Sequence, residues 1–391
     1  MRTIVVLGST GSIGKNTLSV ISEHQKDFEV FALTAHSNVD LLFAQSIKFL
    51  PKFVVVSQSS TAVKLEYLIM KKKLNTKVLF GEDSLIMVTT HKKVDVIVAA
   101  SSGISALRPT FEALKKEKTI LLANKEILVS AGEIFFDLLR VKSRPLLLPI
   151  DSEHSALYQS LPCQNKNYDP EQISKFIITA SGGPFLNKDL KELVNITPDE
   201  ACKHPNWDMG KKISVDSSTM MNKALEIIET YWLFGIPPEK IEVIIHPESV
   251  IHSFVVYKDG SHIAQLSAKD MRIPITYAMY YPRRKKTSSS YNSLNLAKQS
   301  LTFQKFDKNK YYCVALAYKF LKEKDYGSLI VLNASNELLV DLFLQRKIKY
   351  LDIIKYIKKV LNDLNFNYSK DINEIIDLDS KAKKYLKDII F

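Results

Sequence analysis

Cysteines and long hydrophobic runs are what this 391-residue chain has least of. Its three cysteines, Cys163, Cys202 and Cys313, are widely spaced and include no C-x-x-C pair. This argues against a disulfide framework or a zinc knuckle and favours a reducing, cytosol-like compartment. No apolar run approaches the roughly 20 residues that cross a membrane. The chain opens directly on the strand-like Thr3–Leu7 with no basic leader before it, which argues against a signal peptide. We therefore expect a soluble globular protein with no membrane partner.

Acidic residues are in deficit, because 54 Lys and Arg against 42 Asp and Glu give a formal net charge of +12. The basic residues are scattered, and Arg283–Lys286 is the only four-residue basic run. Since the sequence has no basic helix face interleaved with aromatic residues and no recognisable DNA- or RNA-binding motif, we expect no nucleic-acid partner. A positive field instead favours a negatively charged, phosphorylated small-molecule substrate.

The length of the chain argues for more than one domain. Up to about residue 150, apolar runs alternate with helix-length segments such as Val39–Phe49 and Ile127–Val141. The apolar runs are Ile4–Leu7, Glu29–Ala35, Phe53–Ser57, Lys77–Phe80, Val94–Ala100, Thr119–Ala123 and Leu146–Ile150. This alternation predicts an α/β fold with an N-terminal doubly wound, Rossmann-like parallel sheet over residues 1–150.

The pattern changes after residue 150. A strand over Phe176–Thr179 leads into a Gly-Gly-Pro turn, and Ser253–Tyr257 and His262–Ser267 flank a Gly-containing turn, as in a hairpin. From about Tyr311 the pattern becomes helical. We expect a central α+β catalytic domain over residues 151–282, a polar linker over 283–306 and a small helical C-terminal domain over 307–391.

Glycine is scarce as well, yet three of the 12 glycines lie in GSTGSIG, residues 8–14, between the first strand and a helix. Glycines there permit a tight turn and a close approach of the backbone to a pyrophosphate at the helix N-terminus. The segment, which includes Thr10, Gly11, Ser12 and Ile13, therefore predicts a dinucleotide site. A plain strand-to-helix turn is the alternative, because the spacing G-x-x-G-x-x-G departs from the usual G-x-G-x-x-G.

The end of the second strand bears on which dinucleotide binds. An NAD site usually has an acidic residue there, which bonds the ribose 2′-hydroxyl. Here the strand ends in His36, Ser37 and Asn38, with no carboxylate before Asp40. This favours NADP over NAD, although no Lys or Arg is present to hold a 2′-phosphate.

The segment Asp151–His154, DSEH, places two carboxylates and an imidazole within four residues, straight after an apolar run. One interpretation is a helix start, where Asp, Ser and Glu accept bonds from free backbone N–H groups. The other interpretations are an acid/base pair and one half of a metal site. The segment alone leaves all three open.

Two further segments carry groups suited to a phosphate. The first is a loop after a strand that offers the hydroxyl of Ser181 and exposed amides, although a structural turn would have the same sequence. The second is a Ser-rich cap over Ser214–Ser218, which leads into a helix where Asn222, Lys223 and Glu226 share one face. A surface ion pair is the alternative for Lys223 and Glu226.

Between these two segments lies ACKHPNWDMGK, residues 201–211, which contains His204, Trp207 and Gly210. A lone Trp in a loop usually packs against its own domain. A large aromatic residue and a donor histidine between two anion sites would instead suit a lid over a substrate.

Seven motifs, in this order, resemble those of 1-deoxy-D-xylulose 5-phosphate reductoisomerases. They are GSTGSIG, LLANKE (121–126), DSEH, ASGGPF, HPNWDMG, SSTMMNKALEIIE and HPESVIHS (246–253). The resemblance spans essentially the whole chain. It implies an NADPH-dependent enzyme of the non-mevalonate isoprenoid pathway that uses a divalent metal, Mg²⁺, Mn²⁺ or Co²⁺. Such an enzyme isomerises and reduces 1-deoxy-D-xylulose 5-phosphate to 2-C-methyl-D-erythritol 4-phosphate.

The resemblance also implies roles for individual residues. The implied metal ligands are Asp151, Glu153 and Glu226, and the implied catalytic residues are these three with Lys125 and His204. The implied substrate-binding residues are Lys125, Ser152, Glu153, Ser181, His204, Trp207, Ser217, Asn222, Lys223 and Glu226. The implied cofactor-binding residues are Thr10, Gly11, Ser12, Ile13, His36, Ser37, Asn38, Asn124, Glu126, Gly210 and Met271. One departure is that many family members carry a Gly-Lys-Asn-like triplet where this chain has His36-Ser37-Asn38.

Electrostatics support the metal interpretation of DSEH. Two like charges about 4 Å apart repel by roughly 4 kcal/mol at an effective dielectric constant near 20. Three convergent carboxylates therefore require a cation, and ligands that are all oxygen select a hard divalent ion over zinc. We interpret DSEH as one half of the metal site and Glu226 as the other, with a capping contribution from Asp151 or Ser152 still open.

Two other functions are consistent with parts of the sequence. One is an NADP-dependent sugar-phosphate or semialdehyde dehydrogenase, which would work without metal and would usually need a catalytic Cys or a Lys–His couple. The other is a non-enzymatic NADP sensor, which would not need three convergent acids. The resemblance further implies a homodimer. We expect a cytoplasmic bacterial enzyme, or a plastid stromal one if a transit peptide has been trimmed.

Overall fold

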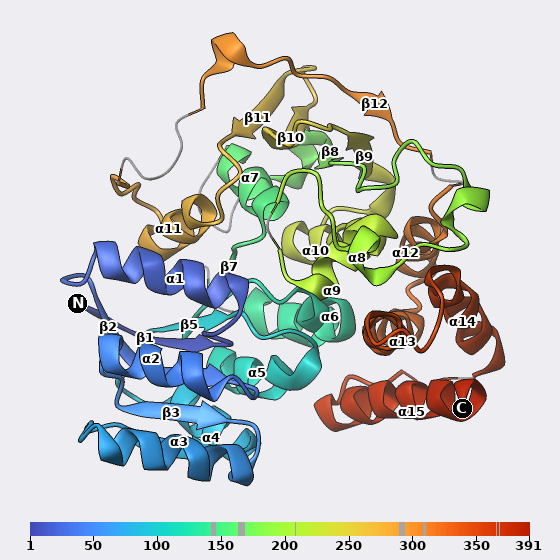
Figure 1. Cartoon of the computed structure of the whole chain (residues 1–391). Helices are drawn as coiled ribbons and strands as arrows, with labels where there is room; N and C mark the ends of the chain where they lie inside the picture. Colours follow the sequence, from blue (N-terminus) through green and yellow to red (C-terminus); the bar gives the residue numbers. More distant parts are fainter. Residues whose placement is uncertain are drawn as a thin grey trace.

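The computed structural model describes residues 1–141, 146–162, 169–207, 209–288, 294–307, 310–364, 366 and 368–391. Cys163 and part of the expected linker lie outside these residues. The described chain forms two sheets and a group of C-terminal helices (Figure 1). Short 3₁₀ turns occur at Ile104–Ala106, Pro170–Gln172, Leu190–Leu193, Pro238–Lys240 and Leu296–Lys298.

The N-terminal sheet has seven parallel strands in the spatial order β4-β3-β2-β1-β5-β6-β7. The strands are β1 (Arg2–Leu7), β2 (Phe28–Ala35), β3 (Phe53–Val56), β4 (Lys77–Phe80), β5 (Val96–Ala99), β6 (Thr119–Leu122) and β7 (Leu147–Pro149). The helices are α1 (Ser12–Glu23), α2 (Val39–Phe49), α3 (Ser59–Lys71), α4 (Glu82–Thr90), α5 (Leu107–Lys115) and α6 (Lys125–Arg140). Because the order runs outward from β1 in both directions, the predicted doubly wound sheet is confirmed.

The central strand β1 shows why the strands in this part of the sequence are continuous apolar runs. Ile4 and Val6 point into one buried cluster, whereas Val5 and Leu7 point into another. All four side chains are buried. A parallel strand covered by helices on both faces has no solvent side, so its apolar residues are continuous rather than alternating.

The glycine-rich segment forms the predicted turn between β1 and α1. A Cβ on Gly14 would lie 2.3 Å from the carbonyl oxygen of Gly8. Gly8 has φ +74°, a conformation that side chains disfavour. The two glycines thus let α1 pack directly against the turn that precedes it.

The second sheet is mixed and has the order β11-β10-β8-β9-β12. Its strands are β8 (Ile173–Ala180), β9 (Ile241–Ile245), β10 (Ile251–Tyr257), β11 (His262–Leu266) and β12 (Gln304–Lys305). The predicted hairpin is confirmed, since β10 and β11 pair antiparallel around a turn in which Gly260 has φ +87°. Strand β12 lies inside the segment expected to be a linker, and the domain boundaries stay a prediction.

Helices connect and flank the second sheet. They are α7 (Ser152–Ser160), α8 (Pro198–Ala201), α9 (Lys211–Ser218), α10 (Met221–Phe234) and α11 (Arg272–Tyr280). The expectation of a Ser-rich cap was wrong, because Ser214, Ser217 and Ser218 lie within α9. A left-handed residue, Met220 with φ +60°, separates α9 from α10. The serines therefore belong to a short helix of their own.

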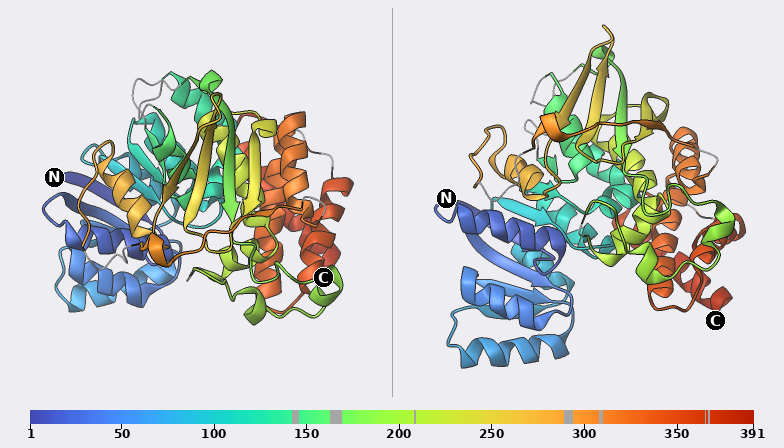
Figure 2. Two further views of the ribbon diagram at one scale, coloured as in Figure 1. Left: turned by 90° about the horizontal axis from the view of Figure 1, so that it is seen from above. Right: turned by 45° about the horizontal axis from the view of Figure 1, so that its top comes forward.

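The C-terminal part is helical, as predicted. It consists of α12 (Tyr312–Glu323), α13 (Tyr326–Leu344), α14 (Tyr350–Asp363) and α15 (Ile372–Ile390). By length and composition, helix α13 could cross a membrane. However, 83% of its most apolar 18-residue stretch is buried inside the protein. Helix α13 is therefore the core helix of the C-terminal group. This group lies beside the N-terminal sheet and its helices, and the second sheet lies across both parts (Figures 1 and 2).

Trp232 of α10 packs against helices from both the N-terminal and the C-terminal parts of the chain. Its indole stacks on Phe136 of α6, with ring centroids 6.3 Å apart, and contacts Tyr326 of α13 at 5.1 Å. A Cβ on Gly132 of α6 would lie 2.3 Å from the same indole. Close packing of α6, α10 and α13 fixes the helices that carry the site described next.

Candidate functional site

The structure contains a cavity of about 550 Å³ at the carboxyl ends of β1 and β7, where the second sheet meets the N-terminal one. In a doubly wound sheet this edge is the usual position of a ligand site. The predicted residues that line the cavity are Ser12, Ile13, Lys125, Asp151, Ser152, Glu153, Ser181, His204, Trp207, Gly210, Ser217, Asn222, Lys223, Glu226 and Met271. Residues from six separate motifs of the sequence thus meet at one place.

Three carboxylates converge at one end of the cavity. Asp151 follows β7 and caps α7, with its Oδ1 accepting a bond from the backbone N–H of Glu153 at 3.2 Å. Glu226 comes from α10, and one oxygen from each of Asp151, Glu153 and Glu226 lies within 4.8 Å of the others. The helix-start and metal-site interpretations of DSEH are therefore compatible, because Asp151 caps α7 and also faces the other two carboxylates.

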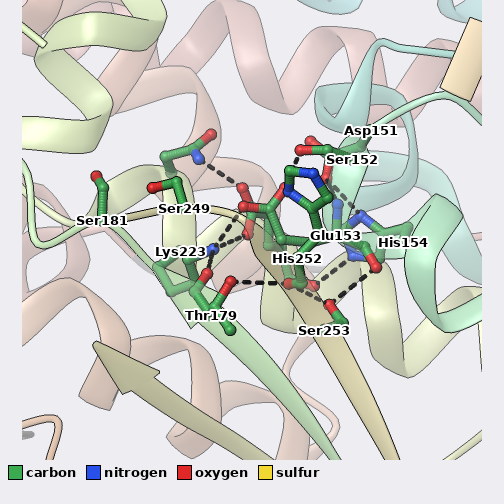
Figure 3. A network of polar contacts seen from close by, with 12 residues as sticks. Asp151, Ser152, Glu153, His154, Thr179, Ser181, Lys223, Ser249, His252 and Ser253 are labelled. Carbon is green, nitrogen blue, oxygen red and sulfur yellow. Dashed lines mark hydrogen bonds and ion pairs between the residues drawn. The ribbon is translucent and has the colours of Figure 1, made fainter. Parts of the chain in front are cut away.

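Two lysines neutralise part of this negative charge. Lys125, the first residue of α6, places Nζ 2.8 Å from Asp151 Oδ2 and 3.2 Å from Glu226 Oε1. Lys223 bonds Glu153 at 3.3 Å and also bonds Glu226 and the carbonyl oxygen of Thr179 (Figure 3). Lys223 and Glu226 are both buried, so their pairing is not the surface ion pair considered for the sequence.

Burial and mutual repulsion show in the pKa values of the acids. Burial and the neighbouring Glu226 raise the pKa of Glu153 to about 7. Burial would also raise the pKa of Asp151, but the charges of Lys125 and His154 hold it well below its usual range. Glu153 therefore lacks enough positive charge around it, which is the state expected of a carboxylate at a cation site.

A buried His–Glu pair lies behind Asp151. His154 Nδ1 is 3.1 Å from Asp151 Oδ1 and 3.3 Å from Glu229 Oε2. Burial would lower the pKa of His154, but Glu229 and Asp151 raise it to about 9. Its Nε2 faces the hydroxyl of Thr230 and the carbonyl oxygen of Glu226, each at 3.0 Å. Glu229 was missed by the sequence reasoning, although its position three residues after Glu226 was a usable signal.

Beside the carboxylates, the cavity also gathers neutral and cationic donors. Ser181 follows β8, Ser217 is on α9, and Asn222 and Lys223 begin α10. All four line the cavity. Hydroxyl, amide and ammonium groups that converge in this way suit a phosphate monoester.

His204 closes this part of the cavity. Its Nδ1 accepts the backbone N–H groups of Asn206 and Trp207, at 3.2 and 3.0 Å, so the ring proton lies on Nε2. Nε2 is 3.0 Å from the Ser181 hydroxyl. Burial, together with the charges of Lys269 and Lys223, lowers the pKa of His204 to about 4. The imidazole is therefore a neutral N–H donor aimed at the anion site.

The loop after His204 lies over the cavity. Trp207, Met209 and Gly210 line it, and the Trp207 ring lies 6.1 Å from the ring of His252. Since the loop contributes a large aromatic side chain and the His204 donor, its position agrees with the lid interpretation.

Several predicted cofactor residues do not line the cavity. They are Thr10, Gly11, His36, Ser37, Asn38, Asn124 and Glu126. Asn124 caps α6 and donates to the carbonyl oxygens of Ser101 and Gly103. The Glu126 carboxylate points to Lys212 at 2.6 Å. Ser12 and Ile13, at the start of α1, and Met271, before α11, do line the cavity.

The sequence reasoning missed other lining residues. They are Lys15, Asn16, Ala123, Thr179, Ala180, Gly182, Met209, Ile213, Met220, Ser249, His252, Lys269 and Asp270. His252 lines the cavity, and its Nε2 lies 3.0 Å from the Ser267 hydroxyl. The motif HPESVIHS was a signal for it, but its imidazole reaches the site only through the pairing of β10 with β8.

Comparison with known protein families shows which proteins this chain resembles. Models of three families match the chain. They are 1-deoxy-D-xylulose 5-phosphate reductoisomerase over residues 4–132, the C-terminal domain of the same enzyme over 147–234, and the DXP reductoisomerase C-terminal domain over 266–385. Together the matches cover the first sheet, strands β8 and β12 of the second sheet, and most of the C-terminal helices.

Relatives match along the full length. The 1-deoxy-D-xylulose 5-phosphate reductoisomerase of Francisella tularensis subsp. novicida (strain U112) is 50% identical over 387 residues, which covers 99% of this chain and 98% of the relative. The enzyme of the same name from Burkholderia lata (strain ATCC 17760) is 44% identical and covers 100% of this chain and 96% of the relative.

Solved structures agree in fold. A DOX-P reductoisomerase in complex with NADPH, fosmidomycin and magnesium has a TM-score of 0.94 at 39% identity, and covers 100% of this chain and 98% of that chain. The 1-deoxy-D-xylulose 5-phosphate reductoisomerase of Zymomonas mobilis in complex with NADPH has a TM-score of 0.88 at 36% identity, with the same coverage.

Proposed function

This chain belongs to the 1-deoxy-D-xylulose 5-phosphate reductoisomerase family, and from that premise we propose that the cavity of about 550 Å³ is its active site. The protein is an NADP-dependent oxidoreductase of isoprenoid precursor biosynthesis. It isomerises 1-deoxy-D-xylulose 5-phosphate and reduces the product to 2-C-methyl-D-erythritol 4-phosphate, with NADPH and a divalent metal.

One observation carries the assignment of the site. The same cavity holds three convergent carboxylates and, beside them, a set of phosphate-type donors. A dehydrogenase that works without metal needs no such acids, and Cys202 and Cys313 do not line the cavity. A protein that only senses NADP needs neither the three carboxylates nor the phosphate-type donors. The arrangement supports a phosphorylated sugar whose other end meets a cation.

The residues present fit a hard divalent cation. Asp151, Glu153 and Glu226 supply oxygen ligands only, and their facing oxygens lie within 4.8 Å of one another. The raised pKa of Glu153, about 7, reports negative charge that nearby lysines leave uncompensated. We assign these three residues as ligands. When bound, such a cation polarises the carbonyl group of the substrate and holds its oxygens in place.

The side chains of the chain itself bind and orient the substrate. Lys125, held by Asp151 at 2.8 Å, presents an ammonium group beside the carboxylates, where it donates to a keto or hydroxyl oxygen. The hydroxyl of Ser152 lies at the same end. Ser181, Ser217 and Lys223 hold the phosphate, and the sugar carbons lie between the phosphate and the carboxylates.

The lid residues and the cofactor side complete the site. His204 donates its Nε2–H to the phosphate, and Trp207 covers the sugar and excludes water from it. Ser12 and Ile13, after the glycine-rich turn, and Met271, before α11, all line the cavity. We place the nicotinamide between these residues, where NADPH transfers hydride to the rearranged aldehyde.

Two properties extend the proposal beyond the site. We propose a homodimer and a cytoplasmic location, or the plastid stroma if a transit peptide has been removed. The family resemblance supports the first, and the widely spaced cysteines support a reducing compartment. Light scattering coupled to gel filtration tests the dimer, which is rejected if the mass is that of one 44.4 kDa chain.

The activity is tested by the absorbance of NADPH at 340 nm with 1-deoxy-D-xylulose 5-phosphate and Mg²⁺ or Mn²⁺. We expect oxidation that EDTA abolishes and that Glu226→Gln reduces by at least about a hundredfold, since a ligand and a buried charge are lost. Glu242→Gln, at an exposed ion pair with Lys175, is the matched control and retains activity. Oxidation indifferent to EDTA would instead identify an ordinary dehydrogenase, and NADPH binding without oxidation would identify a sensor.

A further inference from the structure

Helix α9 has two faces with different neighbours. Ile213 and Ser217, four residues apart, line the cavity. Lys212 and Asp216, also four residues apart, pair with each other at 2.7 Å and do not line it. Because residues four apart share one face of a helix, the second pair is directed to the helices that surround the site.

Lys212 connects this second face to α6. Its Nζ lies 2.6 Å from Oε1 of Glu126, the residue directly after Lys125. The first turn of α6 therefore sends Lys125 to the carboxylate end of the cavity and Glu126 to α9. The Glu126–Lys212 ion pair joins the helix that carries Lys125 to the helix that carries Ser217.

Helix α13, one of the C-terminal helices, also contacts the Lys212–Asp216 pair. Asn336 of α13 is fully buried and donates to Asp216 Oδ1 at 2.8 Å. None of the described residues of α12 to α15 lines the cavity. Helix α13 lies beside α6 and near α9 (Figure 1), so Asn336 is a direct polar link between the C-terminal part and the helix that carries Ser217.

Burial makes this arrangement rigid. Glu126 and Asp216 are 7% and 1% exposed, and burial of Lys212 would lower its pKa, but Asp216 and Glu126 raise it instead. Without the ammonium group, two buried carboxylates would face each other uncompensated, which is strongly unfavourable. Protonation of one carboxylate and a displacement of α9 away from α6 both relieve this repulsion, and each changes the packing of α9, the helix that carries Ser217.

We propose that Lys212 is a positioning residue, which by bridging Glu126 and Asp216, with Asn336 bonded to Asp216, holds Ser217 at the phosphate end of the cavity. The inference rests on the proposed function only for the identity of the phosphorylated substrate. It assigns to Glu126 a place in this bridge, in addition to the cofactor-side role that the family resemblance implies. It also gives the C-terminal helices a defined part in substrate binding.

A double-mutant cycle tests the proposal. Lys212→Met, Ser217→Ala and the double variant are compared with the wild type for the affinity of inorganic phosphate, measured by calorimetry on the protein loaded with NADPH and Mn²⁺. If Lys212 acts through Ser217, each single variant weakens phosphate binding by about tenfold and the double variant also by about tenfold, because coupled residues are not additive. Lys212→Arg, which keeps the charge, restores binding to within about threefold.

Controls separate positioning from a loss of folding. Lys211→Met makes the same change at the exposed neighbouring position and leaves phosphate affinity unchanged. The affinity of NADPH, followed by its fluorescence, stays the same in the Lys212 and Ser217 variants. If Lys212→Met does not fold, Glu126→Gln keeps a bond to Nζ, weakens binding by about threefold and has no added effect in a Ser217→Ala background.

The outcomes are distinct. A total loss of phosphate affinity of about a hundredfold in the double variant would mean that the two residues act independently, and this overturns the positioning role. Wild-type phosphate affinity in Lys212→Met overturns it as well. An equal loss of NADPH affinity also overturns it, because the change would then be a general one. Since the cycle is measured by binding, a wild type that binds phosphate but does not turn over the sugar phosphate would refute the proposed function and leave the positioning result intact.

Discussion

His154 and Glu229 face each other across 3.3 Å in the protein interior, both almost inaccessible to solvent. His154 also contacts Asp151 at 3.1 Å, so a proton on this imidazole is shared between an acid of the cavity and an acid of the interior. Glu229 is the strongest of the charges that raise the pKa of His154 to about 9. The pair therefore keeps a positive charge directly behind Asp151 at neutral pH.

Glu229→Gln should lower the pKa of His154 by at least about one unit, because a buried anion next to the ring is replaced by a neutral amide. The measurement is an NMR titration of ¹⁵N-labelled histidine between pH 6 and 10, with His154→Gln used to assign the signal. Glu242→Gln, at an exposed position on β9, leaves the titration unchanged. A pKa of about 9 retained in Glu229→Gln would show that Asp151 alone holds the proton.

His252 links pH to stability. Burial is the main cause that lowers its pKa to about 4, below the ordinary value near 6.5. A group with a depressed basic pKa stabilises the fold fully above its unfolded pKa, and this contribution is lost as pH falls from about 6.5 through 4. The loss reaches about 2 to 3 kcal/mol near pH 4.5 for a shift of this size.

Replacement by a neutral residue removes this dependence. Between pH 7 and pH 4.5, we expect His252→Gln to lose about 2 kcal/mol less unfolding free energy than the wild type, measured by urea titration in EDTA. His262→Gln, on the exposed hairpin turn, should follow the wild type. If both variants lose as much stability as the wild type, His252 takes up its proton without cost to the fold.

The sequence predicted the fold and the ends of the cavity because both depend on local patterns. The strands of the first sheet read as continuous apolar runs, and Val39–Phe49 was predicted to the residue, since burial on both faces of the sheet leaves such a pattern. Asp151, Glu153 and Ser181 lie directly after β7 and β8, and such positions at strand ends are readable from the chain alone.

The residues that sequence reasoning missed are those whose role depends on packing between distant segments. His252 reaches the cavity because β10 pairs with β8, and no local pattern sets that pairing. Lys212 looks like one of many scattered lysines until α6 brings Glu126 to it across 86 positions. The Ser-rich segment was taken for a cap because serine favours caps, but a left-handed Met220 splits it into a separate helix.

Gly132→Ala should destabilise the protein, because it disturbs the packing of α6 against α10. Its Cβ would lie 2.3 Å from the indole of Trp232, so α6 and α10 must separate or the ring must turn. Overpacking of this kind costs about 1 to 3 kcal/mol. Thermal unfolding measures it.

Gly327→Ala provides the matched control for this substitution. A Cβ at Gly327 meets only ordinary contacts, the nearest at 3.5 Å, and the residue lies in helix α13. We expect unchanged or slightly higher stability there, because alanine favours a helix by about 0.5 to 1 kcal/mol over glycine. Equal effects at the two positions would show that the contact with Trp232 is not what forbids a side chain at Gly132.

The last prediction concerns the choice of cofactor. Ser37 is exposed between the end of β2 and the start of α2, and the first acid after the strand is Asp40, in the first turn of α2. An acid at this position bonds the ribose hydroxyls of NADH and repels the 2′-phosphate of NADPH. Ser37→Asp should therefore weaken NADPH binding by at least about tenfold, while NADH binding is unchanged or stronger.

Quenching of protein fluorescence and the emission of the bound nicotinamide measure both affinities without turnover. Ser84→Asp, on α4 of the same domain, adds the same charge away from the end of β2 and controls for net charge. If Ser37→Asp leaves NADPH affinity at the wild-type value, the 2′-phosphate does not lie at this loop. The NADP preference would then have to come from residues other than His36, Ser37 and Asn38, and Lys15 beside the glycine-rich turn, a cation that lines the cavity, would be the next to replace.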